Sequence, residues 1–523
     1  MAMQNDLAKL FQESCQKYAA LPAFSCLGHT LTFEEVGQQA QAFAAWLQRH
    51  TDLEVGDRIA IQLPNILQYP VAAYGSLLAG LVLVNTNPMY TPREMRHQFI
   101  DSDAKAVVIL GDLLPNLDKI IADTEIRTVI VTDPLDLSGG PARSLSNKIH
   151  VGMQQVLAEG AKLCCNVVYT DNPEQLAILQ YTGGTTGPSK GAMLSHGNVT
   201  ENVNQMMDSI GVRCREGEEI FIAPLPLYHI YAFNLNMVMF FSRGSLNVLI
   251  PNPRDIDSFV KTMAAYPFTA FAGLNTLFVG LCSHPDFAKL DFSQLALTCS
   301  GGTALTEAAA KLWQDTTGCV ISEGYGLSET SPVVTFNPVD GERLGFCGIA
   351  LSRTEIKMVD ALGQEVPQGE PGELWVRGPQ VMQGYWKRPD ATAEAMEDGF
   401  FKTGDIARFD ELGYIQIVDR KKDMVIVSGF NVFPNEVENV LALHPTILEC
   451  AVVGVPDEQT GEAVRAYVVL KPGVTPDKAG LIDYCREQLT AYKVPKQVEF
   501  IAELPKSTVG KTLRNKLRQQ ATA

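Results

Sequence analysis

Short runs of hydrophobic, mostly β-branched residues alternate with helix-length segments through roughly the first 300 residues. The clearest runs, each predicted to form a strand, are Arg58–Leu63, Ala106–Leu110, Thr128–Thr132, Leu176–Thr182, Glu219–Leu225, Ser245–Ile250, Thr269–Gly273 and Leu295–Ser300. Strands separated by helical segments are typical of βαβ units, which build parallel sheets. Several runs end in Gly- or Thr-rich loops, and ligands bind at the carboxyl ends of parallel strands. We therefore predict an α/β fold with binding loops after its strands.

The pattern changes after about Gly341. The runs Glu355–Asp360, Glu373–Gly378 and Tyr414–Asp419 are separated by brief turns and predict a small antiparallel β-barrel or sheet. A charged break follows, and beyond it the runs Glu449–Val455, Val464–Leu470 and Val498–Ile501 alternate with helical segments. We therefore predict a large N-terminal domain over residues 1–418 with this small β subdomain. A domain boundary at 419–422 would separate it from an α+β domain over 423–523, with a surface turn inside one domain as the alternative.

Charge restricts the class of partner. The 523 residues include 42 Lys and Arg against 59 Asp and Glu, a formal net charge of −17. That sign repels phosphate backbones, so no nucleic-acid partner is expected. From Leu481 onward the balance reverses, with eight basic and four acidic residues. A locally basic tail suits a small polyanion, although a solvated helix face would have the same composition.

Cysteine usage and the hydrophobic runs restrict the compartment. The 11 cysteines include no Cys-x-x-Cys pair, which argues against a zinc site or a disulfide scaffold and for reducing conditions. The N-terminus lacks the charge pattern of a signal peptide. No hydrophobic run approaches the roughly 20 residues that span a bilayer. We expect a cytoplasmic protein and leave peripheral contact with the inner face of the membrane open.

The segment Tyr181-Thr-Gly-Gly-Thr-Thr-Gly-Pro-Ser-Lys-Gly191 is the most informative motif. It follows a predicted strand and precedes a helix expected near His196, the order that a phosphate site requires. Its glycines free backbone N–H groups to surround an anion, and Lys190 adds a positive charge. It is not a Walker A loop, because Gly191 rather than Ser or Thr follows the lysine.

Three further motifs are weak in isolation. Glu323-Gly-Tyr-Gly-Leu-Ser-Glu-Thr330 offers a ring for stacking and a carboxylate for a hard cation. Thr403-Gly-Asp405, with Asp419-Arg-Lys-Lys422, offers a carboxylate after a Gly turn for a diol and a guanidinium for phosphate. Pro505-Lys-Ser-Thr-Val-Gly-Lys511 places a lysine before the last helix. The alternatives, a packed tyrosine, turn residues and solvated charges, stay open for each motif alone.

Together the ordered motifs resemble the adenylate-forming superfamily of acyl-CoA synthetases, luciferases and peptide-synthetase adenylation domains. The resemblance implies ATP and CoA as co-substrates, Mg²⁺ as cofactor, Lys511, Glu329 and Thr185 as catalytic residues, and Glu329 with Thr185 near the metal. It implies a hinge at Lys422 and a CoA channel at Ser428, Gly429 and Phe430. The implied acyl-pocket residues are His229, Phe233, Gly273 and Gly302. The implied nucleotide-binding residues are Thr182, Gly183, Gly184, Thr185, Thr186, Gly187, Lys190, Gly301, Gly302, Thr303, Tyr325, Gly326, Asp405 and Arg420.

The resemblance is strongest to bacterial long-chain fatty acid–CoA ligases, in the segments Pro226–Asn234, Asn252–Phe278 and Val418–Glu438. One departure is Asn515, where relatives often carry a second Arg, and it puts one phosphate contact in doubt. A medium-chain substrate, and transfer of the acyl group to a carrier protein instead of CoA, remain alternatives. A non-catalytic acyl- or nucleotide-binding protein is a remote alternative. The family also implies a fatty acid as partner and a homodimer.

Overall fold

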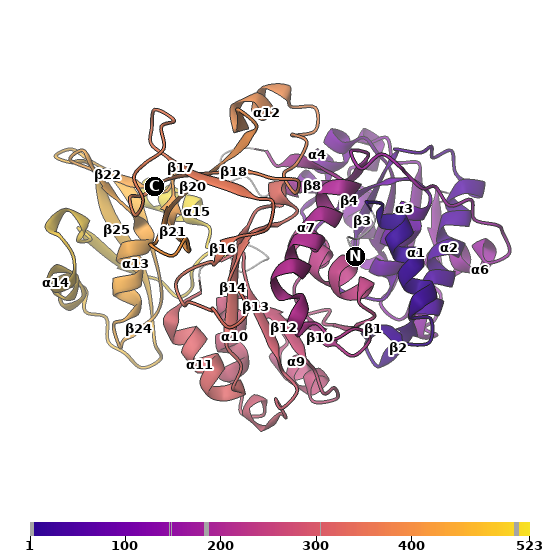
Figure 1. The fold of residues 1–523 in the computed structure, drawn as a ribbon, viewed down its shortest axis with the longest axis horizontal. Helices are drawn as coiled ribbons and strands as arrows, with labels where there is room; N and C mark the ends of the chain where they lie inside the picture. Colours follow the sequence, from indigo (N-terminus) through magenta and orange to yellow (C-terminus); the bar gives the residue numbers. More distant parts are fainter. Residues whose placement is uncertain are drawn as a thin grey trace. The chain divides into compact units, whose positions relative to one another are not determined.

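The computed structural model describes residues 5–145, 147, 149–182, 188–303, 305–506 and 512–522. It separates into two compact units (Figure 1). The first comprises residues 1–344, 350–354 and 377–397, and the second comprises residues 345–349, 355–376 and 398–523. Parallel sheets and helices build the first unit, and largely antiparallel sheets with helices build the smaller second one, which confirms the predicted fold class.

One sheet of the first unit has the strand order β7-β6-β5-β3-β4-β8-β9. The strands are β3 (Arg58–Gln62), β4 (Val82–Asn85), β5 (Ala104–Leu110), β6 (Thr128–Thr132), β7 (His150–Gly152), β8 (Leu176–Thr182) and β9 (Lys190–Ser195). All neighbouring pairs are parallel except β8 and β9. The middle strands are hydrophobic on both faces, as expected for parallel strands covered by helices.

The other sheet of this unit has the order β16-β15-β14-β13-β12-β10-β11-β1-β2. Its strands are β1 (Pro22–Cys26), β2 (His29–Thr32), β10 (Ile220–Ala223), β11 (Leu246–Leu249), β12 (Ala270–Gly273), β13 (Leu297–Ser300), β14 (Ile321–Gly326), β15 (Val333–Phe336) and β16 (Ile349–Ala350). Neighbouring strands pair in parallel along the part of this order that comprises β14, β13, β12, β10, β11 and β1. Strands β2 and β15 run antiparallel to β1 and β14. The carboxyl ends of the parallel strands therefore share one edge.

Helices of the first unit begin at defined capping residues. Thr32, Thr91 and Ser195 each close a capping box at the start of α2, α4 and α7, so the exposed first-turn N–H groups are satisfied. The longer helices are α1 (Leu7–Lys17), α2 (Phe33–His50), α3 (Gln68–Leu78), α4 (Pro92–Ser102), α6 (Met153–Gly160), α7 (His196–Ile210), α9 (Ile256–Met263), α10 (Asn275–Cys282), α11 (Glu307–Thr317) and α12 (Pro389–Ala395). None of the helices in the described ranges is long and apolar enough to cross a bilayer.

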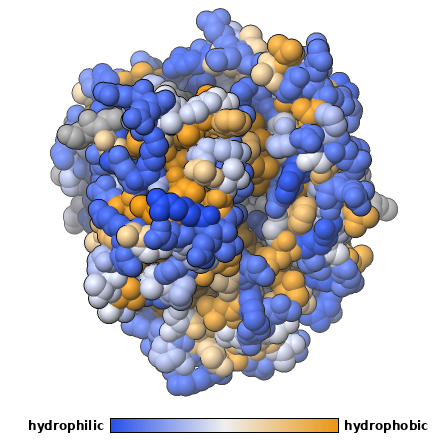
Figure 2. Space-filling model, turned by 90° about the vertical axis from the view of Figure 1, so that its left-hand side faces the viewer, coloured by the Kyte–Doolittle hydropathy of each residue, from blue (hydrophilic) through white to orange (hydrophobic). Residues whose placement is uncertain are grey.

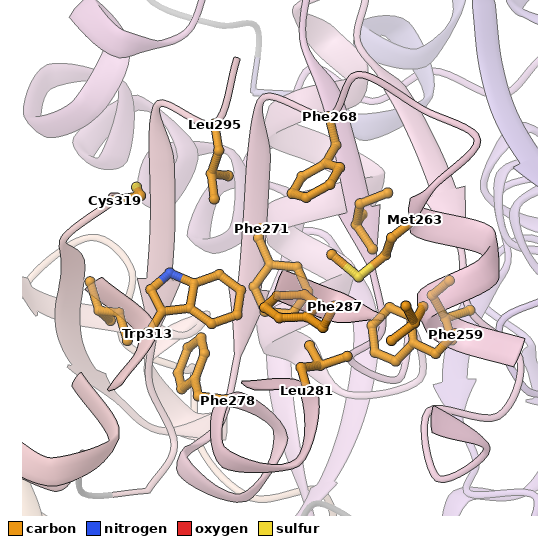
Figure 3. Close-up of a cluster of buried hydrophobic side chains, with 14 of the residues drawn as sticks. Phe259, Met263, Phe268, Phe271, Phe278, Leu281, Phe287, Leu295, Trp313 and Cys319 are labelled. Carbon is orange, nitrogen blue, oxygen red and sulfur yellow. The ribbon is translucent and has the colours of Figure 1, made fainter. Parts of the chain in front are cut away.

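A cluster of aromatic and aliphatic side chains fills the space between β12, β13 and helices α9 to α11 (Figure 3). Trp313 of α11 is fully buried there, and its ring stacks on Phe271 with centroids 5.0 Å apart. Its indole N–H donates to the hydroxyl of Thr298 at 3.2 Å. The cluster fixes β12 and β13, whose carboxyl ends carry the predicted binding loops.

Replacing Trp313 with phenylalanine is expected to lower the free energy of unfolding by about 1–3 kcal/mol. The change removes one ring from a fully buried position and deletes the donor to Thr298. Urea unfolding of the full-length protein measures the loss. The Thr298→Val variant and the double variant form the control: together they should lose less than the sum of the single losses. Equal stability of Trp313→Phe and the wild type would contradict the packing described.

Two further sheets belong mainly to the second unit, and of their strands β19 lies in residues of the first unit. The first has the order β17-β18-β20-β19 with β21 paired to β20, formed by β17 (Glu355–Val359), β18 (Gly372–Arg377), β19 (Met396–Glu397), β20 (Phe400–Phe409) and β21 (Ile415–Arg420). The second has the order β23-β22-β25-β24 with β26 paired to β25, formed by β22 (Val425–Val427), β23 (Phe430–Val432), β24 (Ile447–Asp457), β25 (Gly461–Leu470) and β26 (Gln497–Phe500).

Strands β24 and β25 are hydrophobic on both faces. Val452, Val464 and Val468 point into a core with α13 (Pro434–Ala442) and α14 (Lys478–Gln488), whereas Val453 and Tyr467 point toward Leu517 of α15 (Arg514–Thr522). This alternation follows from the two-residue period of a strand. Helices on both faces make this sheet a self-contained α+β core, the architecture expected for residues after the predicted hinge at 419–422. The hinge itself stays a prediction.

Candidate active site

The glycine-rich motif joins two antiparallel strands. Thr182 ends β8 and Lys190 begins β9, and the two residues are register partners. Gly183, Gly184, Thr185, Thr186 and Gly187 lie outside the described residues. The expected helix does begin at His196, but strand β9 separates it from the loop. The predicted strand–loop–helix order is therefore wrong in one respect: any anion held by this loop lies at a strand connection, not at the N-terminus of α7.

Lys190, Tyr385 and Glu329 lie together. The Lys190 ammonium is 4.8 Å from the centroid of the Tyr385 ring, and the Tyr385 hydroxyl donates to Glu329 Oε1 at 2.8 Å. The Glu329 side chain is buried, with 9% of the residue exposed. Burial, and then the negative charge of Glu329, raise the pKa of Tyr385, so its phenol stays protonated and donates. The structure thus places the predicted site residues Lys190 and Glu329 next to one tyrosine, Tyr385, which no motif indicated.

The segment around Tyr385 is fixed by backbone bonds. Gln383 N–H donates to the carbonyl of Met193, Met193 N–H to the carbonyl of Gly384, and Trp386 N–H to the carbonyl of Gly191, at 2.8–3.0 Å. Met382 N–H donates to the Glu329 carbonyl at 2.8 Å. This segment therefore extends along β9 and also holds the turn that carries Glu329.

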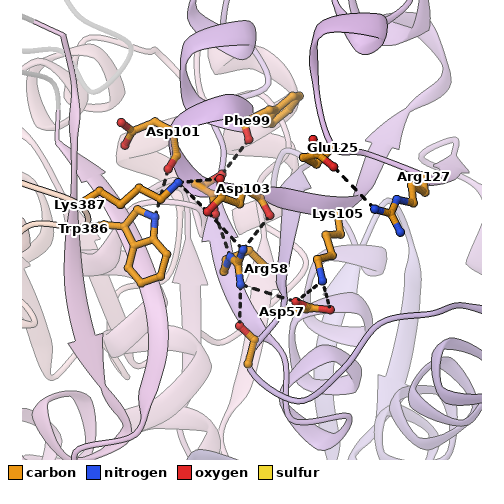
Figure 4. A network of polar contacts seen from close by, with 12 residues as sticks. Asp57, Arg58, Phe99, Asp101, Asp103, Lys105, Glu125, Arg127, Trp386 and Lys387 are labelled. Atoms are coloured by element: carbon orange, nitrogen blue, oxygen red, sulfur yellow. Dashed lines mark hydrogen bonds and ion pairs between the residues drawn. The ribbon is translucent and has the colours of Figure 1, made fainter.

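Side chains anchor the same segment to α4, to Asp103 directly after it and to β3 (Figure 4). Trp386 Nε1 donates to the carbonyl of Asp101, and Lys387 pairs with Asp103 at 2.6 Å. Arg388 pairs with the Asp101 carboxylate at 2.6 Å. Arg58 lies over the Trp386 ring, with its guanidinium carbon 5.6 Å from the centroid. Exposed ion pairs contribute little singly, but together they hold residues 386–388 at one position.

The predicted base-edge residues lie at the shared edge of the second sheet. Gly273 and Ser300 end β12 and β13 and are register partners, and Ser300 is in turn the partner of Glu323 within β14. Gly301 and Gly302 follow β13; Gly302 has φ +83°, and a side chain at Gly301 would come within 3.3 Å of the Gly324 carbonyl. The chain therefore passes close to β14 there, as a loop that lies against a planar ligand must. Thr303 continues this loop.

Tyr325 and Gly326 end β14. A Cβ at Gly326 would lie 2.1 Å from the Pro332 carbonyl oxygen, so only glycine fits. The chain then turns through a 3₁₀ segment, η7 (Ser328–Thr330), which presents Glu329. The carboxyl end of a parallel strand, a partly buried ring at Tyr325 and a buried carboxylate thus follow one another within five residues.

The predicted acyl-side residues His229 and Phe233 precede and begin a π-helical segment, η5 (Phe233–Phe240). His229 caps the short helix α8 (Ile230–Ala232), because its Nδ1 accepts from the backbone N–H of Tyr231 at 3.4 Å. Phe233 is buried. π-Helical turns are rare and often occur at functional sites. Gly273, the third predicted acyl-pocket residue, lies against Phe271 and Phe278, whose rings would be 2.9 Å from a Cβ there.

Glu323 is the first residue of the motif that ends at Thr330, and the sequence indicated no role for its side chain. One carboxylate oxygen accepts from the backbone N–H of Leu305, and the other has no hydrogen-bond partner among the described residues. Burial raises the pKa of Glu323 to about 7, partly offset by the Leu305 bond. A titrating carboxyl group therefore lies beside the loop formed by residues 301–303.

The raised pKa predicts a pH-dependent stability. Between about pH 4.5 and pH 7 the folded protein keeps a proton that the unfolded chain loses, so Glu323 makes stability fall as pH rises. Glu323→Gln removes this effect. The unfolding free energy of the variant relative to the wild type should therefore rise by about 2 kcal/mol from pH 5 to pH 8, measured by urea unfolding. A difference independent of pH would show that Glu323 is not buried as described.

In the second unit, Asp405 and Arg420 are register partners on β20 and β21. Arg420 Nε lies 3.3 Å from Asp405 Oδ1. The sequence suggested a Gly turn before Asp405, but Thr403, Gly404 and Asp405 lie inside β20, where Gly404 has φ +71°. The chain bulges there without leaving the strand, because the register with β18 shifts between Glu373 and Trp375. A carboxylate and a guanidinium still lie side by side, as binding of a ribose and a phosphate would require.

The residues predicted for the hinge and CoA channel follow directly. Lys422 lies in the turn after β21, and burial and the charge of Arg420 lower the pKa of Lys422. Ser428 and Gly429 connect β22 to β23 with φ +52° and +85°, the pattern of a two-residue type I′ hairpin turn. Phe430 is 56% exposed and stacks on Tyr492. Hydrophobic residues also interrupt the polar surface on the face seen in Figure 2. Lys511 lies outside the described residues.

A buried ionic cluster beside the predicted hinge was missed. Arg514 Nη2 contacts both oxygens of Glu438, at 2.8 and 2.7 Å, and Arg518 pairs with Asp423 at 2.7 Å. Asp419 accepts from the backbone N–H of Asn435 at 2.7 Å, and burial raises its pKa to about 6. Within the last helix the sequence singled out only Asn515, where one phosphate contact is in doubt. Arg514 instead ties the last helix to α13.

Comparison with known proteins supports one family. The model of the AMP-binding enzyme family matches residues 11–386, and the model of its C-terminal domain matches residues 436–511. A protein named long-chain-fatty-acid–CoA ligase from Escherichia coli O6:H1 is 47% identical over 98% of this chain and 94% of its own. One of the same name from Yersinia pestis is 45% identical over 99% and 94%. The crystal structure of ATP-bound MatB from Rhodopseudomonas palustris has a TM-score of 0.86 and 31% identity over 98% of both chains. The chain belongs to the AMP-binding enzyme family.

Proposed function

We propose that this protein is an ATP-dependent, AMP-forming long-chain fatty acid–CoA ligase. The observation that carries the proposal is similarity over nearly the full chain to ligases of that name. The same similarity extends through the segments around His229 and Gly273, where the acyl group would bind. The predicted nucleotide residues other than 183–187 lie at or next to strand ends or on paired strands, and such ligands bind at strand ends.

The reaction has two steps. A fatty acid carboxylate oxygen attacks the α-phosphorus of ATP; an O–P bond forms, the bond to pyrophosphate breaks, and acyl-AMP remains. The CoA thiol then attacks the acyl carbonyl, loses its proton and displaces AMP. The first step brings two anions together, so the site must supply positive charge. Lys190 and Lys511 are the lysines to which we assign this role.

Glu329 suits a magnesium site. Among the described residues no three His, Cys, Asp or Glu side chains gather to hold a metal ion by themselves. Mg²⁺ is commonly bound by one or two carboxylates together with water and substrate phosphates, so a single buried carboxylate fits it. Glu329 would hold the ion with Thr185 nearby, and the ion would neutralise charge on the phosphates. Tyr325 would stack on adenine beside Gly301, Gly302 and Thr303.

The second unit would contribute to both steps. Asp405 would accept hydrogen bonds from the ribose hydroxyls, with Arg420 beside it for the ribose or a phosphate. Lys511 would bridge the carboxylate and the α-phosphate during adenylation. Lys422 would then act as the hinge that removes Lys511 from the site and brings Ser428, Gly429 and Phe430 to the pantetheine arm.

A fatty-acid series from C4 to C20 tests the proposal, with benzoate as a control and with pyrophosphate and CoA thioester followed separately. Both products, with an optimum at C12 or longer, are expected. An optimum at C8 or shorter would replace the long-chain assignment by a medium-chain one. Pyrophosphate without thioester would move the acceptor from CoA to a carrier protein.

A further inference from the structure

We propose that Tyr385 is a positioning residue for nucleotide activation: its hydroxyl orients the Glu329 carboxylate and its ring orients the Lys190 ammonium. The inference rests on the proposed function, since it deepens the roles given there to Glu329 and Lys190. Tyr385 belongs neither to the glycine-rich motif of residues 181–191 nor to the motif of residues 323–330; it lies in the segment that follows β18. The proposal assigns it no contact with a substrate.

The first observation is the hydroxyl contact. The Tyr385 O–H donates to Glu329 Oε1 at 2.8 Å, and the Glu329 carboxylate is buried. A hydrogen bond to a buried charged group is stronger than one between neutral groups, and it selects one rotamer of the carboxylate. One Glu329 oxygen is therefore held by the protein, and this limits the orientations that the carboxylate can take.

The second observation is the ring contact. The Lys190 ammonium lies 4.8 Å from the Tyr385 ring centroid, within the range of a cation–π interaction. A lysine side chain has four rotatable bonds, so a single surface lysine samples many positions. The ring limits that freedom and keeps the ammonium at the beginning of β9, directly after the predicted phosphate loop.

The third observation is that Tyr385 itself cannot easily move. Its backbone N–H donates to Thr392 Oγ1 at 2.9 Å, and it forms a β-bridge with Ala192. The adjacent bonds of Gln383 and Trp386 to β9 hold it on both sides. Because Tyr385 is held rigidly, it sets the separation between the Lys190 ammonium and the Glu329 carboxylate. An ATP triphosphate with its counter-ion must match the positions of these two charges.

Two substitutions separate the two contacts. Tyr385→Phe removes the hydroxyl and keeps the ring, so we expect an approximately tenfold weaker affinity for ATP in the presence of Mg²⁺. Its affinity for ATP without Mg²⁺ should stay close to that of the wild type. Tyr385→Leu removes the ring as well and should weaken ATP binding without Mg²⁺ by about threefold. Isothermal titration of the full-length protein with ATP, with and without Mg²⁺, gives both numbers.

Tyr18→Phe is the matched control. Tyr18 is buried, whereas Tyr385 is half-buried; the Tyr18 hydroxyl likewise donates to a glutamate, Glu216, at 2.8 Å, but Tyr18 is no predicted site residue. This variant should bind ATP like the wild type under both conditions. In steady-state pyrophosphate formation, Tyr385→Phe should raise the KM for ATP at limiting Mg²⁺ more than it lowers kcat.

These measurements either support or overturn the role of Tyr385. Equal affinities for Tyr385→Phe and the wild type, or a loss that is the same with and without Mg²⁺, would overturn the proposal and leave Tyr385 a packing residue. If the wild type binds ATP but forms no pyrophosphate with any fatty acid, the proposed function fails while the binding comparison still tests Tyr385. Circular dichroism of each variant confirms that it is folded.

Discussion

The Lys511→Ala variant is expected to form pyrophosphate about 10²–10³-fold more slowly than the wild type, as is typical when one preorganised charge is lost from a transition state. The same variant should convert supplied acyl-AMP and CoA to thioester at nearly the wild-type rate. The reason is that Lys511 is assigned to the first step alone, where negative charge develops between the carboxylate and the α-phosphate. Single-turnover assays of each half-reaction measure the two rates.

Lys506 offers the control for this experiment. It is a lysine of the same basic tail, and its ammonium pairs with Glu449. Lys506→Ala changes the net charge by the same amount, so similar losses in both variants would indicate a general electrostatic effect. If Lys511→Ala lost both half-reactions equally, the assignment of Lys511 to adenylation alone would be wrong.

The Lys422→Pro variant is expected to show the opposite pattern: thioester formation about 10²-fold slower, with adenylation changed only a few-fold. Proline fixes φ near −65°, so it blocks the torsional change that a hinge must make. The local turn should survive, because Asp423 and Met424 N–H groups both donate to the Arg420 carbonyl and neither donor is replaced. Stopped-flow measurement of each half-reaction separates the two rates.

Lys422→Ala distinguishes a hinge from a contact. Alanine removes the ammonium but leaves the backbone free to rotate, so this variant should keep most of its thioester formation. If Lys422→Ala and Lys422→Pro lose the same amount, the side chain matters and the torsion does not. Equal loss of both half-reactions in Lys422→Pro would point to a folding defect.

The parallel strands could be predicted from sequence because they are buried on both faces. Thr128–Thr132 and Leu176–Thr182 match β6 and β8 residue for residue. Strand β4 was not predicted because it follows α3 within one continuous hydrophobic run, where periodicity cannot separate a buried helix from a buried strand. Strand β9 was not predicted because it contains glycine and follows a proline and a serine. It is extended because β8 and residues 383–386 pair with it.

The motifs predicted residues whose chemistry is local to one loop, such as Lys190 and Glu329. They could not predict Tyr385, which follows Glu329 by 56 residues and whose role depends on pairing with β9. Arg514 was missed for a similar reason: its partner Glu438 is 76 residues away. Contacts between distant segments leave no spacing in the sequence, and the structure is needed to find them.

The division of the chain between the two compact units has a consequence for protein engineering. The sheet β17 to β21 takes strands from residues 355–377 and 396–420, and the segment between them, residues 378–395, belongs to the first unit and interrupts it. This sheet cannot be exchanged between relatives as one continuous piece. The sheet β22 to β26 is continuous in sequence and has its own core. A chimaera joined after Arg420 would therefore transplant a complete sheet, whereas one joined at Asp398 would separate β18 from its partner β20 and expose an unpaired strand edge.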